Sequence, residues 1–196
     1  MSSRVLKVLA AAGAKDPYEI ENSLRFNYTG QSYLKRTPSS TGDQRTWTLS
    51  FWTKMLHPQN TYVFCAGQIA STSVETFMQS GGWQDSMFGQ NYSPTYWRTS
   101  TVYDQAEDPA AWYHIVIAID TTDGTAADRC KLFVNGSRVT SFETQTNFDQ
   151  NDTIEWFQSD ATVYVGGEFE GGTIGTNTND GYIADLNFVD GTQYDA

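Results

Sequence analysis

The sequence is poor in basic residues, and this shortage excludes two classes of partner. Its 196 residues include 12 Lys and Arg against 23 Asp and Glu, for a formal net charge of -11. A nucleic-acid-binding protein needs a basic surface for the phosphates, and anionic membranes attract basic segments. We therefore expect no nucleic-acid partner and no binding to an anionic membrane surface.

Cysteine and histidine are also scarce, with two residues of each. Four such residues do not make a convincing zinc site. Cys130 has the same strand parity as Leu132 and Val134, which predicts a thiol that faces the core. The sequence leaves open whether it pairs with Cys65. A chain of this length buries about 70% of its unfolded surface, so no cofactor is required for folding.

Long apolar runs are absent as well. No segment approaches the roughly 20 apolar residues of a membrane-spanning helix. The apolar patch in residues 1–14 is interrupted by Lys7 and is too short for a signal peptide. We therefore expect that the protein is made in a cytoplasm and does not insert into a membrane.

Residues 1–22 differ from the rest of the chain because their apolar residues have helical spacing. Gly13 and Pro17 end the pattern. A helix of about ten residues is marginal alone in water, so it needs to dock on its own domain or on another protein. We interpret residues 1–22 as an arm for docking and assembly. The apolar face of the arm contains Val5, Leu6, Val8 and Leu9.

The rest of the chain, residues 23–196, is rich in aromatic residues, Thr, Ser, Asn and Gly, which favour strands and turns. In residues 46–54 the side chains of Trp47, Leu49 and Phe51 alternate with Thr48, Ser50 and Trp52. This period of two predicts a strand with one buried face. Further strands are predicted at 24–26, 61–69, 112–120, 129–135, 137–142, 161–165 and 181–189.

Two of these strands and one turn support more detailed predictions. In residues 112–120 both faces are apolar, which predicts a strand covered on both sides. Asn135-Gly136 predicts a hairpin turn, because both positions tolerate positive φ. Short strands and the lack of helical periodicity favour one all-β, two-sheet antiparallel sandwich. In the last strand we expect one face to contain Tyr182, Ala184, Leu186 and Phe188.

The segments WYHIVIAID, KLFVNGSRV and GYIADLNFVDG, taken in this order, resemble the concanavalin A-like, laminin G-like jelly roll over residues 23–191. More narrowly, the chain resembles structural proteins of marine bacteriophages. There an arm like SSRVLKVLAAAGA leads into SLRFN and a strand that ends like Tyr33-Leu34. The resemblance implies a virion protein of the tail-fibre or appendage type, made in the host cytoplasm. It also implies that Ala196 ends the first domain of a longer chain.

The same resemblance implies partners. The arm would anchor the protein to other virion proteins of the tail or capsid. The jelly roll would contact a host surface glycan or neighbouring subunits. Symmetric homo-oligomers are the default for such parts, and a trimer suits a fibre. The alternative is a capsid or tail decoration protein that binds no glycan.

A glycan hydrolase is the third alternative. Glu168 and Glu170 lie two apart, but the catalytic strand of related glucanases would continue the acidic series at position 172, which is glycine. His114 has no nucleophile motif to serve, which favours a structural histidine. We therefore expect no catalytic residues and no enzyme.

The strongest candidates for glycan contact lie in residues 83–103. Sugars stack on aromatic rings, and polar side chains hold their hydroxyl groups. Packing in the core is an equally weighted explanation for these rings. The candidates are Trp83, Gln84, Asp85, Tyr92, Tyr96 and Trp97.

Calcium is the one metal that we consider. Laminin G-like domains often bind Ca²⁺ at their rim, and the resemblance points to Asp120, Asp123 and Asp128 in the loop DTTDGTAAD. Their spacing matches no fixed calcium loop. Turn formation and solvation explain these carboxylates more simply.

Overall fold

In the residues that it describes, the computed structural model has 14 elements, and all but one are strands. The arm residues 1–19, including Val5, Leu6, Val8 and Leu9, lie outside the described residues. The structure describes residues 20–55, 62–68, 74–79, 88–90, 108, 110–142, 145–154, 157–159, 161–167, 169–170, 173–174 and 178–196.

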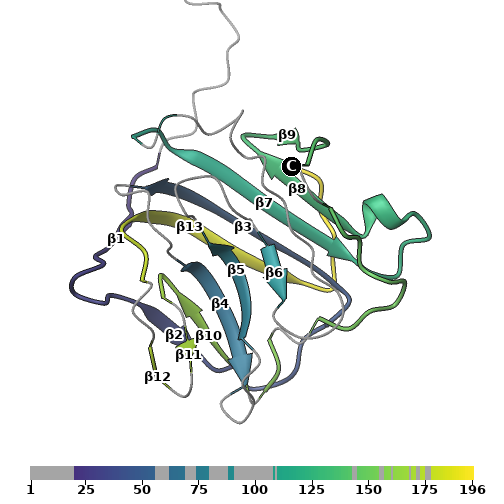
Figure 1. The fold of residues 1–196 in the computed structure, drawn as a ribbon, viewed down its shortest axis with the longest axis horizontal. Coiled ribbons are helices and arrows are strands. Elements are labelled where there is room, and N and C mark those ends of the chain that lie inside the picture. The colour runs from purple at the N-terminus through teal and green to yellow at the C-terminus, as the bar shows by residue number, and fades with distance from the viewer. Residues whose placement is uncertain are drawn as a thin grey trace, which may run out of the picture.

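Within this part of the chain, two antiparallel sheets form the predicted all-β sandwich (Figure 1). The first sheet has the order β1 (Leu24–Phe26), β13 (Gly181–Asp190), β3 (Thr46–Met55), β7 (Tyr113–Asp120), β8 (Cys130–Val134) and β9 (Ser137–Arg138). The second has the order β2 (Leu34–Arg36), β10 (Ala161–Val165), β4 (Tyr62–Gln68), β5 (Val74–Gln79) and β6 (Phe88–Gln90). The smaller elements are the pair β11 (Phe169–Glu170) and β12 (Thr173–Ile174), and the 3₁₀ helix η1 (Ala126–Asp128).

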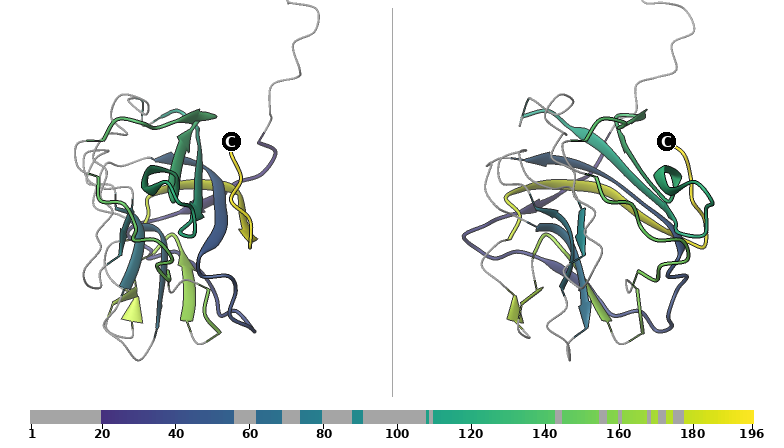
Figure 2. Two further views of the ribbon diagram at one scale, coloured as in Figure 1. Left: turned by 90° about the vertical axis from the view of Figure 1, so that its right-hand side faces the viewer. Right: turned by 45° about the vertical axis from the view of Figure 1, so that its right-hand side comes forward.

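The two sheets pack face to face, and the first sheet curves over the second (Figure 2). Trp47, Leu49 and Phe51 of β3 are fully buried between them, as their alternation predicts. Ile115, Ile117 and Ile119 of β7 extend the same core. The opposite face of this sheet, called the outer face below, buries a smaller cluster of Val116, Ala118 and Phe133. The prediction that β7 is covered on both sides is confirmed.

The prediction for the faces of the last strand is wrong, because β13 contains a bulge. Ala184 pairs with Trp52 and Asn187 with Ser50, so three residues of β13 advance past two of β3. An extra residue on one strand shifts the alternation by one position. Ile183 therefore faces the core before the bulge, whereas Leu186 and Phe188 pack against it afterwards.

The hairpin at Asn135-Gly136 has the predicted geometry, with φ of 50° and 78°. The return strand β9 ends at Arg138, so it is shorter than the predicted 137–142. The thiol of Cys130 is free and buried in the core beside Leu132, which confirms its predicted orientation. Burial raises the pKa of this thiol, so it stays protonated.

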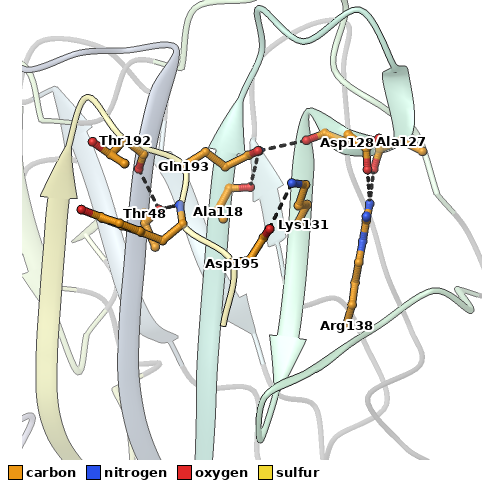
Figure 3. A network of polar contacts seen from close by, with 10 residues as sticks. Thr48, Ala118, Ala127, Asp128, Lys131, Arg138, Thr192, Gln193 and Asp195 are labelled. Carbon is orange, nitrogen blue, oxygen red and sulfur yellow. Dashed lines mark hydrogen bonds and ion pairs between the residues drawn. The ribbon is translucent and has the colours of Figure 1, made fainter.

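The last residues of the chain lie across the outer face of β3, β7 and β8 (Figure 3). The Thr48 hydroxyl donates to the carbonyl of Thr192 at 2.8 Å, and it accepts from the amide of Tyr194 at 2.9 Å. The Gln193 side chain donates to the carbonyls of Ala118 and Asp128. These contacts cover part of the outer face with the C-terminal segment 192–196.

No helix in the described part of the chain has the length and apolar character needed to cross a membrane.

Candidate functional site

A cleft on the outer face of the first sheet combines aromatic and polar side chains. Its volume is about 320 Å³. Strands β3, β7 and β13 lie side by side here and supply all of its lining residues. We call it the outer-face cleft, and it is lined by Ser50, Trp52, His114, Asp185 and Asn187.

The aromatic wall of the cleft consists of Trp52 and His114, which are cross-strand partners in β3 and β7. Their rings stack with centroids 5.0 Å apart and an interplanar angle of 28°. Both side chains are half-buried, so part of each ring reaches solvent. Burial lowers the pKa of His114, which favours the neutral imidazole at neutral pH. A neutral imidazole can both donate and accept a hydrogen bond.

The polar wall depends on the bulge in β13. Asp185 lies inside the bulge with a φ of 46°, and both Asp185 and Asn187 are exposed. The Asn187 side-chain amide donates to the Asp185 carbonyl at 2.7 Å, which fixes the orientation of that amide. Bulges commonly redirect side chains beside functional sites. Here the bulge brings a carboxylate and an amide to the Trp52 ring.

The residues predicted to contact glycan belong to segments that the structure does not describe. Trp83, Gln84, Asp85, Tyr92, Tyr96 and Trp97 all lie outside the described residues. The same holds for Glu168 and for the side chain of Glu170. Their roles, or lack of them, stay predictions.

Part of the outer-face cleft could have been found from the sequence. The alternation in β3 already placed Trp52 opposite the buried Trp47, on the face with Thr48 and Ser50. The sequence did not indicate that His114 is the partner of Trp52, because this pairing depends on the register between β3 and β7. Asp185 and Asn187 were missed because nothing in their sequence indicates the bulge.

The sequence profile of one superfamily, described as "Concanavalin A-like lectin/glucanases superfamily", matches residues 28–193. The chain belongs to this superfamily. Its two antiparallel sheets have the lectin-like jelly-roll architecture that the sequence predicted. Among curated proteins, none matches the sequence significantly.

Solved structures with the same fold include domains LG4–5 of the mouse laminin α1 chain. The identity is 15% and the TM-score 0.60, over 98% of this chain and 48% of the laminin chain. A SAP-like pentraxin from Limulus polyphemus has 16% identity and a TM-score of 0.46, over 80% of this chain and 68% of the other. Domain 4 of AbnA, an arabinanase from Geobacillus stearothermophilus solved with arabinotriose, has 13% identity and a TM-score of 0.48, over 83% and 68%. At these identities the likeness concerns the fold alone.

The three aspartates considered for calcium in this lectin-like domain lie around the turn after β7, and each accepts a hydrogen bond within the protein. Asp120 accepts from the hydroxyl of Thr122 at 2.6 Å. Asp123 accepts from a backbone amide at 2.7 Å, and Asp128 accepts from Arg138 at 2.7 Å. Among the described residues, no three His, Cys, Asp or Glu side chains are placed to hold a metal ion. Calcium binding by this loop stays a prediction.

Proposed function

We propose that this lectin-like jelly roll binds a glycan in the outer-face cleft, as part of a bacteriophage virion protein of the tail-fibre or appendage type. The observation that carries the proposal is the Trp52–His114 stack beside the Asp185 carboxylate and the Asn187 amide. The ring gives the apolar C–H face of a sugar a surface to stack on. The carboxylate and amide supply acceptors and a donor for its hydroxyl groups.

The size and charge of the cleft define the ligand further. Its volume of about 320 Å³ is at the lower end of the range for ligand pockets, roughly 300–1,000 Å³. This favours a short terminal saccharide over a long chain. The net charge of -11 and the carboxylate of Asp185 repel anions. We therefore expect neutral sugars to bind in preference to sialylated or sulfated ones.

The virion setting is supported by the sequence resemblance alone, through the arm and the strands that follow it. In that setting the glycan belongs to the host surface, and the protein works by attachment without catalysis. The sequence expectation that the arm anchors the protein to other virion proteins is part of this proposal.

A glycan-binding measurement on the purified domain tests the site. The domain is screened against neutral and anionic glycans, and affinity for the strongest ligand is measured by calorimetry. Trp52→Ala should weaken binding roughly tenfold, because aromatic stacking contributes about 0.5–1.5 kcal/mol beyond the burial of area. Asp185→Asn should weaken it too, because a hydrogen bond to a charged group becomes a neutral one.

The matched control is Trp112→Ala, which removes the same side chain from outside the cleft. Trp112 is half-buried and packs against Tyr182 with centroids 6.3 Å apart. This variant should retain full affinity. If the Trp52→Ala protein also retains full affinity, the glycan binds elsewhere. If no glycan binds the native domain, the decoration protein without glycan affinity becomes the better explanation.

A further inference from the structure

An apolar groove lies at one end of the sandwich, where the edges of the two sheets face each other. It consists of two adjoining cavities of about 630 and 500 Å³. Leu34 of β2, Val165 of β10 and Leu186 of β13 line both cavities, which makes them one continuous groove. Phe64 and Phe188 extend its apolar lining. We call it the edge groove.

Apolar side chains of the edge groove are open to solvent in the described part of the chain. Leu34 is 49% exposed, and Leu24 at the other end is 54% exposed. Soluble domains usually bury such surface or use it for an interaction. An apolar segment that covered the groove would gain free energy in proportion to the area it removes from water.

Strand pairing beside the groove covers only part of β13. On its edge side β13 pairs with β1 only from Gly181 to Ile183. Among the described residues, no strand continues this pairing along Leu186–Asp190. This side of the groove, beside Leu186 and Phe188, is therefore not covered by a described strand.

The direction of the chain indicates which segment this is. Because β1 is antiparallel to β13, the residues that precede Leu24 run toward the Asp190 end of β13. Asn22 and Ser23 already line the edge groove. The chain before them comprises 21 residues, which include the apolar face of the arm that the sequence predicts. The groove begins where the arm ends.

We propose that residues 1–19 dock in the edge groove of their own chain. The apolar face of the arm, Val5, Leu6, Val8 and Leu9, then covers the three residues shared by both cavities. A ten-residue helix is about 15 Å long. The eight residues of β13 from Ile183 to Asp190 extend about 23 Å, so the groove is long enough for the helix. The short tether gives the arm a high effective concentration at its own groove.

This inference is independent of the glycan proposal. It gives the arm a place on its own domain in the free protein, whatever the outer-face cleft binds, and anchoring to other virion proteins would require the arm to leave the groove. It also explains how a segment too short to form a stable helix in water could become ordered.

Hydrogen exchange followed by mass spectrometry tests the docking on the full chain. The full chain should show protected amides in residues 34–36 and 186–190. Pairing with β10 and β3 already protects part of these amides, so deletion of residues 1–19 should lower this protection without abolishing it, and should leave the core strands β3 and β7 protected. The pair Leu6→Asp and Leu9→Asp should do the same at full chain length, which keeps the test valid if the deletion variant does not fold.

The matched control is the pair Ala10→Asp and Ala11→Asp, which adds the same charge on the opposite face of the predicted helix. It should keep the protection of the full chain. Identical exchange at 34–36 and 186–190 in all four proteins would overturn the proposal. Protection that rises with protein concentration would also overturn it, because the arm would then come from a second copy.

Discussion

Gly136 and Gly166 have nearly the same φ angle in different surroundings. Their φ angles are 78° and 81°, a region that costs a residue with a Cβ roughly 1–2 kcal/mol. A Cβ on Gly136 would meet open space, whereas a Cβ on Gly166 would overlap the ring of Phe26. Phe26 is only 3% exposed. Substitution of Gly136 therefore measures the cost of backbone strain alone, whereas substitution of Gly166 adds the cost of the overlap with the Phe26 ring.

Alanine substitution at each position measures the two costs. Gly136→Ala should lower the free energy of unfolding by about 1–2 kcal/mol through the backbone alone. Gly166→Ala should lower it by a further 1–3 kcal/mol or so, because the buried ring of Phe26 has to shift. Urea denaturation provides the comparison. If the two variants are equally stable, the contact between Gly166 and Phe26 is looser than the structure indicates.

Among the structural elements, the C-terminal segment 192–196 covers the outer face instead of extending a sheet. Its contacts differ in burial. Thr48 is 4% exposed and makes two hydrogen bonds to the segment, whereas the Lys131–Asp195 ion pair, with N···O of 3.1 Å, includes a carboxylate that is 72% exposed. A surface ion pair contributes little, while a buried polar group left without its partner is costly. We expect the Thr48 contacts to hold the segment in place.

Substitutions of the two residues should differ accordingly. Thr48→Val keeps the shape of the side chain but leaves the Thr192 carbonyl and the Tyr194 amide without their partner, at a cost of about 1–3 kcal/mol. Lys131→Met removes only the ion pair and should change stability by less than about 1 kcal/mol. Thermal unfolding checks both. A larger loss for Lys131→Met would mean that the ion pair holds the segment.

Prediction of the elements succeeded where alternation was uninterrupted. In β3 and β7 the period of two gave the buried faces, and it gave the bounds to within one residue. In β13 the same reasoning failed after Ala184, because the bulge is set by pairing with β3. The 3₁₀ helix at Ala126–Asp128 was not predicted either, since three residues are too few for a periodic signal.

At the scale of the whole molecule, the two faces of the first sheet make different contacts. One face forms the core with the second sheet, and the other carries the outer-face cleft and the C-terminal segment. The edge groove lies at the side where β1 and β2 form the sheet edges (Figure 1). Asp185 lines both the groove and the outer-face cleft, so an arm in the groove and a glycan in the cleft would be neighbours.

The proposed virion setting is also tested with the whole molecule. Antibodies raised to residues 23–196 and marked with gold should label the tail or its fibres on intact particles, viewed by electron microscopy. Antibodies to an unrelated intracellular protein give the background. Label spread over the head would favour a capsid decoration protein. Particles without label would contradict the virion assignment.

The sequence by itself determined the fold class, the buried faces of β3 and β7 and the turn at Asn135-Gly136. Each of these follows from local periodicity, backbone preference or composition, which a linear sequence contains in full. Tertiary structure alone decided which residues of β13 face the core after the bulge, and it alone paired Trp52 with His114. It also decided that the edges of the two sheets enclose an apolar groove. These features depend on strand register between residues far apart in the chain, and register is fixed only when the sheets form and pack.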